Sequence, residues 1–296
     1  RWLRVCVVLL CVSSVLPAGG SKIIPLDADI YDVIDLLYIE SRKALPSGSR
    51  PWSIDEWEMH LDRLNYDTLS AAGKRGYSYI TGELEGQGEY LFDLGDRAQV
   101  NLGVETSFEI YGHANKEDFP DESDWVYGYT DRNSPLKAAL ELSLSGGFYL
   151  YGDIEYRKNR FGYDELQEDV STAEAYNHHV STNLFSLEDV DFETPYRAFL
   201  AVGGKDWNIA FGRDLMRWGH GNQSNLIIHD HLDFHEMLRF TSFHDQIKFE
   251  ITYLFFNHDE FDTKSERPPD GIKMFLGHRL EFRPFDWLSL SLTENV

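Results

Sequence analysis

Three histidines and two acidic residues form the densest group of possible metal ligands in this sequence: His229, Asp230, His231, His235 and Glu236. The pattern is a His-x-His pair followed four residues later by a third histidine. Imidazole nitrogens in such a group can bind Zn²⁺. No helix or strand is clearly predicted around them, and a cluster in a loop is weak evidence for a site. We therefore predict no metal centre and no cofactor, and keep His229, His231 and His235 as candidate ligands only.

Aromatic side chains in an acidic segment could bind a sugar. Trp125, Tyr127 and Tyr129 lie within residues 113–134, among several Asp and Glu residues. Aromatic rings stack on the apolar faces of sugars, and neighbouring carboxylates accept hydrogen bonds from hydroxyl groups. The alternative is an aromatic girdle at a membrane interface, where Trp and Tyr are enriched. We favour the girdle, also for Trp207 and Trp287, and keep the first three residues as candidate glycan-binding residues.

Trp218, Gly219 and Gly221 open another long connection and are further candidate glycan-binding residues. Glycine permits a tight backbone course that other residues resist. One hypothesis is a loop that folds over a pore and shapes a glycan site or a plug. The other is a structural turn that packs on the wall of a barrel.

Glutamates recur along the predicted strands, where pairs of carboxylates could catalyse glycoside hydrolysis. We expect them to face the lumen of a barrel, where acidic side chains are more often hydrated or tune ion selectivity. The sequence contains no nucleophile elbow, phosphate-binding loop or catalytic triad pattern. We therefore predict that the protein is not an enzyme. The glutamates concerned are Glu83, Glu85, Glu89, Glu105, Glu109 and Glu141.

Polar and apolar residues alternate between Tyr79 and Ile110, over two runs that a short turn separates. Successive side chains of a strand point to opposite faces, so the pattern predicts strands with one polar and one apolar face. The runs exceed the roughly five or six residues of an ordinary strand and are long enough to cross a membrane at a tilt. This length favours an outer-membrane β-barrel.

Paired runs continue along the rest of the chain, and with the first two they predict about ten strands. Tight turns and long segments alternate between them, as in bacterial outer-membrane barrels. One feature does not fit: if the helices are periplasmic and residues 77–92 form the first strand, the tight turn after that strand is extracellular. Either another strand precedes or interrupts that run, or the helices lie elsewhere. The paired runs are 136–144 with 148–156, 196–202 with 207–213, 237–242 with 246–256, and 271–282 with 287–293.

Residues 21–74 are predicted to form a small helical bundle on the periplasmic side. Ile30, Val33, Ile34 and Leu37 recur at helical spacing. Ser53-Ile54-Asp55-Glu56 is a capping box, which predicts the start of a second helix. A third short helix is predicted around residues 66–72. The fold class is mainly β: an antiparallel transmembrane β-barrel over residues 75–296, incomplete in this chain, preceded by the bundle.

The first residues and the net charge restrict location and partners. Residues 1–20 have the charged, apolar and small-residue order of a signal peptide, which predicts export to the outer membrane. Both cysteines, Cys6 and Cys11, lie inside this segment, so we expect no disulfide in the mature chain. The net charge of −23 disfavours nucleic acid as a partner. We expect outer-membrane lipid as surroundings, divalent cations at acidic loops, and a monomer.

The segment from Trp207 onward contains distinctive motifs. They are Trp207-Asn208-Ile209-Ala210-Phe211-Gly212-Arg213, Arg217-Trp218-Gly219-His220-Gly221, Ser224-Asn225-Leu226-Ile227, and the stretch from Leu280 to Leu290. Together they resemble the capsule-assembly Wzi family of outer-membrane lectins. Arg50-Pro51-Trp52, between two predicted helices, also matches the layout of that family. His220 stands where the family usually has Pro.

This resemblance implies an eighteen-stranded barrel with a helical bundle at its periplasmic mouth, of which the present chain is roughly the first half. It also implies a non-enzymatic protein that binds capsular polysaccharide or exopolysaccharide at the cell surface. The alternative function is a porin-like channel with an acidic, cation-preferring lumen. The Trp218-Gly219 motif favours the lectin, and the acidic wall favours the channel.

Overall fold

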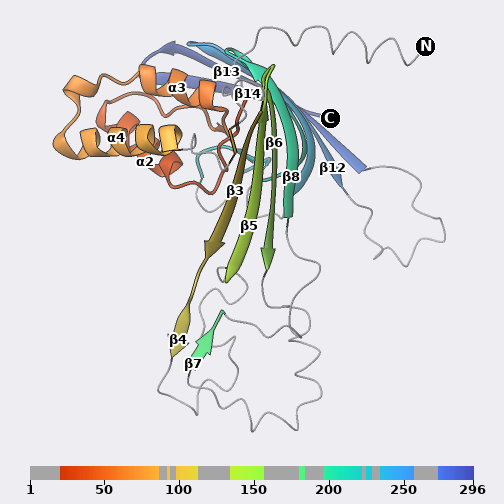
Figure 1. The fold of residues 1–296 in the computed structure, drawn as a ribbon. Coiled ribbons are helices and arrows are strands. Elements are labelled where there is room, and N and C mark those ends of the chain that lie inside the picture. Colours follow the sequence, from red (N-terminus) through yellow and green to blue (C-terminus); the bar gives the residue numbers. More distant parts are fainter. Residues whose placement is uncertain are drawn as a thin grey trace, which may run out of the picture. The chain divides into compact units, whose positions relative to one another are not determined.

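The protein is mainly β, with one large antiparallel sheet and a smaller helical part. The computed structural model describes residues 21–86, 92–93, 98–112, 134–156, 180–183, 196–221, 225–228, 234–256 and 273–296. Figure 1 shows the helices α2, α3 and α4 and the long strands. The chain divides into two compact units, residues 1–101, 141–151 and 197–296 forming the first, and residues 102–140 and 152–196 the second.

The large sheet contains ten strands in the order β14-β13-β12-β11-β9-β8-β6-β5-β3-β2. Apart from the β2 end, its strands are long, and tight turns connect β5 to β6, β8 to β9, β11 to β12 and β13 to β14. This confirms the predicted mainly-β class and the hairpins from residue 136 onward. The strands are β2 (Phe92–Asp93), β3 (Ala98–Thr106), β5 (Leu136–Leu144), β6 (Phe148–Tyr156), β8 (Tyr196–Gly204), β9 (Trp207–Asp214), β11 (His235–Phe243), β12 (Ile247–Phe256), β13 (Lys273–Phe285) and β14 (Leu288–Asn295).

Two small sheets accompany the large one. In the second unit, β4 (Ile110–Gly112) pairs with β7 (Val180–Thr182). In the first unit, β1 (Ser49–Arg50) pairs with β10 (Arg217–Trp218), so that a strand between two helices contacts the connection between β9 and β11. This second pairing joins residues about 170 positions apart in the chain, and no local sequence pattern predicts it.

The helical segment, which we define as residues 21–86, has an apolar core of its own. Helix α2 (Ile30–Glu40) buries the stripe that includes Ile34 and Leu37, as predicted from its spacing. Helix α3 (Ile54–Asp62) begins at Ser53, whose hydroxyl accepts a hydrogen bond from Glu56 N at 3.4 Å. The predicted cap is therefore confirmed. The η1 turn (Tyr66–Thr68) and helix α4 (Ala71–Gly86) complete the segment.

The strand predicted from Tyr79 onward was wrong, because residues 71–86 form helix α4. The same residues also carry a helical stripe, with Tyr77, Ile80 and Leu84 packed into the core of the segment. Gly76 lets α4 approach α2 closely, since a Cβ there would lie 3.1 Å from Val33 Cγ1. The helical part therefore extends beyond the predicted limit of residue 74.

This correction also removes the inconsistency in strand order. Among the described residues, only the two of β2 precede β3 in the large sheet. Asn101 of β3 hydrogen-bonds Glu141 of β5 at 3.4 Å, which places the start of β3 beside the β5–β6 turn. The chain thus enters its first long strand at the same end of the sheet as the other tight turns, and no earlier crossing is required.

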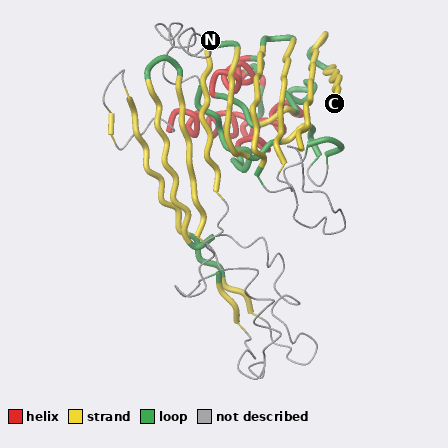
Figure 2. The backbone as a smooth tube through the Cα atoms, turned by 90° about the vertical axis from the view of Figure 1, so that its right-hand side faces the viewer, coloured by secondary structure: helices red, strands yellow, loops and turns green. Residues whose placement is uncertain are grey.

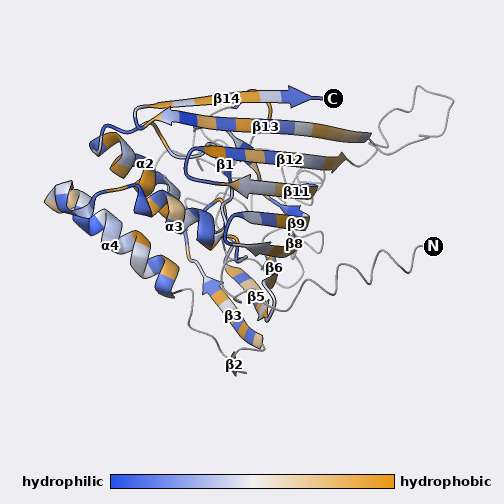
Figure 3. Cartoon of the chain, turned by 90° about the horizontal axis from the view of Figure 1, so that it is seen from above, coloured by the Kyte–Doolittle hydropathy of each residue, from blue (hydrophilic) through white to orange (hydrophobic). Residues whose placement is uncertain are grey.

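Several strands of the first unit bury polar side chains and expose apolar ones, although Met237, Phe243 and Leu254 are buried as well. On β12, Lys248, Glu250 and Thr252 are at most 5% exposed, whereas Ile247 and Phe249 are 43% and 37% exposed. Figure 3 shows the helical segment near one end of these strands, and hydrogen bonds from Lys248 and Arg239 join it to the side that carries the buried polar residues. We call the side that contacts it the polar face. The opposite, apolar face exposes Leu200, Phe211, Leu238, Ile247, Phe249, Leu280, Phe282, Leu290 and Leu292.

Candidate functional site

The main candidate site is the contact between the helical segment and the polar face, at the end of the sheet that carries the tight turns (Figure 2). Its centre is a group of four buried charged side chains: Glu56 of α3, Arg239 of β11, and Lys248 and Glu250 of β12. We call this group the charge cluster. Because side chains two positions apart on a strand share a face, β12 presents Lys248 and Glu250 to the helices together.

Glu250 accepts hydrogen bonds from several elements at once. Trp218 Nε1 donates to it at 2.6 Å and Thr252 Oγ1 at 3.0 Å, and the hydroxyl of Ser49 donates to its other oxygen. Arg239 Nη2 lies 3.1 Å from Glu250 Oε2. One carboxylate therefore joins strands β11 and β12 of the large sheet to β1 and β10. A fully buried carboxylate requires such compensation, since desolvation of an unpaired charge is costly.

Lys248 holds the helical segment in the same way. Its Nζ lies 2.5 Å from Glu56 Oε1 and donates to the carbonyl of Ser49 at 2.8 Å. Arg239 Nη1 donates to the carbonyl of Pro51 at 2.7 Å. Burial raises the pKa of Glu56, while the nearby Lys248 and Arg239 lower it. The Glu56 carboxylate is thus bonded to Lys248 of β12 and does not close the predicted capping box.

Arg50 forms a second buried contact beside the charge cluster. Its guanidinium lies 4.9 Å from the ring centroids of both Tyr31 and Trp52, and Nη2 lies 2.5 Å from Asp35 Oδ1. Burial lowers the pKa of Arg50, and Asp35 opposes that effect. The Arg50-Pro51-Trp52 motif named in the sequence analysis therefore packs between the helices and the polar face of the large sheet. Cation–π contacts of this kind are stronger when they are desolvated.

Trp218, Gly219 and Gly221 lie at this interface. Trp218 is 3% exposed and its indole N–H is bonded to Glu250. Gly219 has φ +139°, and a Cβ there would overlap Asn225 Oδ1, so the position requires glycine. Gly221 N donates to that same oxygen at 3.0 Å. This placement favours the structural-turn hypothesis for the three residues, and their contact with a glycan stays a prediction.

The other predicted site residues are only partly covered. Trp125, Tyr127, Tyr129, His229 and His231 lie outside the described residues. His235 is buried at the start of β11, opposite Asp214 in the register. Over the ranges that the structure describes, no three His, Cys, Asp or Glu side chains are arranged to hold a metal ion.

The predicted lumen glutamates are separated by the fold. Glu83 and Glu85 lie on α4 rather than on a strand, which corrects their predicted place. Glu89 lies outside the described residues. Glu105 and Glu109 belong to the second unit. Glu141 faces the helical segment, where it pairs with Lys22 and accepts a hydrogen bond from Tyr149 at 2.9 Å.

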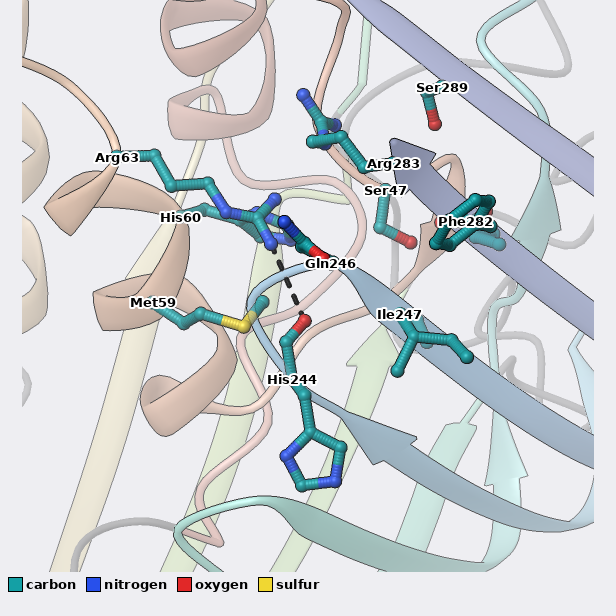
Figure 4. Close-up of a pocket in the computed structure, with 12 residues that line it drawn as sticks. Ser47, Met59, His60, Arg63, His244, Gln246, Ile247, Phe282, Arg283 and Ser289 are labelled. Atoms are coloured by element: carbon teal, nitrogen blue, oxygen red, sulfur yellow. Dashed lines mark hydrogen bonds between the residues drawn. The ribbon is translucent and has the colours of Figure 1, made fainter. Parts of the chain in front are cut away.

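A small cavity lies beside the charge cluster, below the end of α3. Figure 4 shows His60, Arg63, His244 and Arg283 around it. The cavity has a volume of about 20 Å³, enough for a water molecule. Both ring nitrogens of His60 are buried there without a hydrogen-bond partner among the described residues. Burial first, and then the charges of Arg63, Lys248 and Arg283, hold the pKa of His60 well below its usual value.

Sequence reasoning missed the charge cluster, although one signal was present. The run from Ile247 to Thr252 alternates apolar residues with Lys, Glu and Thr. That alternation predicts a strand with a polar face, but it does not reveal which helix supplies the opposite charge. Comparison of the chain with protein-family models, curated proteins and solved structures finds no match.

None of the helices among the described residues is both long and apolar enough to cross a membrane.

Proposed function

We propose that this protein is a non-enzymatic outer-membrane β-barrel protein that binds a surface polysaccharide, either capsule or exopolysaccharide. The membrane part of this proposal rests on the distribution of side chains in the first unit, which buries polar groups and exposes apolar ones. Charged side chains such as Glu250 and Arg239 are at most 3% exposed, while Phe211 is 60% and Leu292 72% exposed. A large exposed apolar surface with a polar interior suits a wall that faces lipid.

The position of the helical segment favours a barrel with a plugged interior rather than an open channel. Its contacts with the polar face include the buried charge cluster, the largely buried pair of Lys22 with Glu141, and the pair of Arg197 with the half-exposed Asp27 at 3.2 Å. A water-filled pore needs that face to be hydrated. The channel remains the second candidate function, because the polar face carries charges of both signs and the protein is strongly acidic.

The polysaccharide part of the proposal rests on the resemblance of residues 207–290 to the Wzi lectins. The Trp218–Gly221 motif closes tightly through Asn225, with hydrogen bonds of 3.0 and 3.1 Å between Asn225 and Gly221. This turn holds the connection between β9 and β11 against the helical segment. Trp125, Tyr127 and Tyr129 remain the side chains that we expect to contact sugar.

The test is reconstitution of the complete natural protein into liposomes. Ion conductance is measured alongside binding of the surface polysaccharide purified from the source organism. We expect retention of the polysaccharide without conductance, and weaker retention after Trp125→Ala, Tyr127→Ala and Tyr129→Ala together. Tyr66→Ala, at an exposed tyrosine of the helical segment, is the matched control. Conductance without polysaccharide binding would overturn the lectin in favour of the channel.

A further inference from the structure

A second cavity lies at the rim of the first unit, where the tight turns meet the helical segment. It has a volume of about 80 Å³. We call it the rim cavity. Three cations line it, namely Lys43, Arg63 and Arg283, together with two acids, Asp245 and Asp286. Gln246, Pro284 and Phe285 complete the lining.

The three cations of the rim cavity are fixed in place by the fold. Arg283 donates to the carbonyls of Ala44 at 2.7 Å and Leu45 at 2.5 Å. Arg63 Nε donates to Asp245 at 3.0 Å, and Lys43 Nζ to Asp286 at 2.6 Å. Arg63 also donates to the carbonyl of His244 at 3.4 Å and hydrogen-bonds the Tyr38 side chain, whereas within the described part of the chain two ammonium hydrogens of Lys43 have no partner. Spare, preorganised donors of this kind bind phosphate oxygens strongly.

The two acids of the rim cavity are much more exposed than the cations. The side chains of Asp245 and Asp286 are 80% and 78% exposed, against 13% for Arg63 and 20% for Lys43. Lys43 holds the pKa of Asp286 below its usual value, so this carboxylate is ionised at neutral pH. The cavity therefore offers positive charge at its base and negative charge at its edge. A headgroup that carries a phosphate and an ammonium matches both.

An apolar surface begins directly beside these charges. Arg283 shares the polar face with Glu281 and Arg279, two and four positions before it. The pairing of β13 with β14 then shifts register between Phe282 and Phe285, and this bulge places Phe285 opposite Leu288 on the apolar face. Phe285 stacks on Trp287 with ring centroids 5.5 Å apart and planes at 3°. Both rings are more than half exposed. Tryptophan, as at Trp287, is enriched where a membrane meets water.

We propose that the rim cavity binds the headgroup of an aminophospholipid, a zwitterionic lipid with a phosphodiester and a primary ammonium. The phosphate lies between Arg63 and Lys43, and the ammonium lies at Asp245 or Asp286. The acyl chains follow Phe285 and the apolar face beyond it, toward Phe282 and Leu290. This inference rests on the proposed membrane location, since it places the tight turns at the depth of lipid headgroups.

The test is native mass spectrometry of the full chain in detergent micelles with added lipid. Short-chain phosphatidylethanolamine is compared with phosphatidylglycerol, with diacylglycerol and with inorganic phosphate. We expect one phosphatidylethanolamine to be retained in preference to the others. The double variant Lys43→Gln with Arg63→Gln should weaken that retention by at least about tenfold, as expected for the loss of two charge-assisted hydrogen bonds. Lys74→Gln with Lys205→Gln is the charge-matched control outside the cavity.

Each outcome decides the proposal. Equal retention of all lipids, or equal loss in the control variant, overturns it. Binding of inorganic phosphate without a lipid preference shows a free-anion site and overturns the lipid assignment. Insertion into liposomes is measured separately by protection from added protease. Insertion without selective lipid retention removes only this inference, whereas failure to insert removes the membrane part of the proposed function.

Discussion

Single residues of the charge cluster determine how firmly the helical segment is held. Glu56, Arg239, Lys248 and Glu250 carry two positive and two negative charges, and each is at most 5% exposed. Such a group gives little net stabilisation relative to apolar residues, but removal of one member leaves a buried charge unpaired. We therefore infer that the cluster contributes specificity, because a displaced α3 would leave Glu56 and Lys248 buried without their partners.

The variant Lys248→Met should destabilise the protein by about 3–5 kcal/mol, because Glu56 then loses its partner in a buried site. Chemical denaturation in detergent micelles measures this loss. The double variant Lys248→Met with Glu56→Leu removes both charges, and we expect its loss to be smaller than the sum of the single losses. Additive losses would show that the two side chains do not interact.

His60 should make the stability of the helical segment depend on pH. Its pKa is lowered in the folded state, so below about pH 6.5 the unfolded chain binds a proton that the folded protein excludes. Stability is then lost as pH falls, by up to about 1.4 kcal/mol per pH unit. The charged groups that act on His60 come from three elements. They are Glu56 on its own helix and Arg63 at the C-terminal cap of that helix, Lys248 on β12, and Glu281 and Arg283 on β13.

The comparison of wild type with His60→Gln isolates this effect. Glu56 has the opposite effect on the pH dependence of stability. Because its pKa is raised in the folded state, its contribution to stability increases as pH falls toward about 4.5. That contribution is present in both proteins and cancels in their difference. Denaturation at a series of pH values from 7.5 to 5 should show a smaller acid loss in the variant. Identical pH profiles would exclude His60 as the titrating group.

At the scale of elements, the start of α3 determines where Glu56 reaches the wall. The hydroxyl of Ser53 caps the helix at Glu56 N, and Ile54 N donates to the carbonyl of Lys22 at 2.9 Å. The cap and the neighbouring backbone contact together fix the first turn. The capping signal in the sequence was sufficient to predict this boundary.

Ser53→Ala should destabilise the protein by about 1 kcal/mol through loss of the cap. Thermal or chemical denaturation followed by far-ultraviolet circular dichroism measures the change. Ser78→Ala, at an exposed position within α4, is the control and should be neutral or slightly stabilising, because alanine has the higher helix propensity. An equal loss in both variants would contradict a specific capping role.

At the scale of the whole molecule, the exposed apolar face is the feature that bears on the proposed membrane location. Exposed apolar surface of this extent usually marks an interaction site or contact with lipid. The exposed residues recur at every second position of adjacent strands, as on β8 with Leu200 and β9 with Phe211. A regular band of this kind fits a continuous solvent such as lipid better than a discrete partner.

Phe211→Lys tests this interpretation directly. In a bilayer, a lysine facing lipid should cost about 2–4 kcal/mol near the midplane. Leu36→Lys is the matched control, since Leu36 on α2 is 64% exposed, against 60% for Phe211. Folding into liposomes, followed by the shift of the folded band on an unheated gel, should be impaired only by Phe211→Lys. Equal behaviour of the two variants would argue against a lipid-facing wall.

The sequence by itself determined most of the strands. Alternation on both sides of tight turns located the hairpins at residues 136–156, 196–213, 237–256 and 271–293, because strand period and turn chemistry are local properties. The same alternation failed over residues 79–86, where Tyr77, Ile80 and Leu84 also satisfy a helical period. Packing of these residues against α2 decided between the two, and that contact is not local.

Which residues meet at the site follows only from the tertiary structure. Ser49 and Glu250, Glu56 and Lys248, and Lys43 and Asp286 are each separated by about 190 residues or more. A local pattern gives the face on which each side chain lies, but it carries no information about a partner so distant in the chain. The sequence left open whether Trp218 shapes a glycan site or belongs to a structural turn, and the fold shows that its indole N–H is bonded to Glu250 inside the interface.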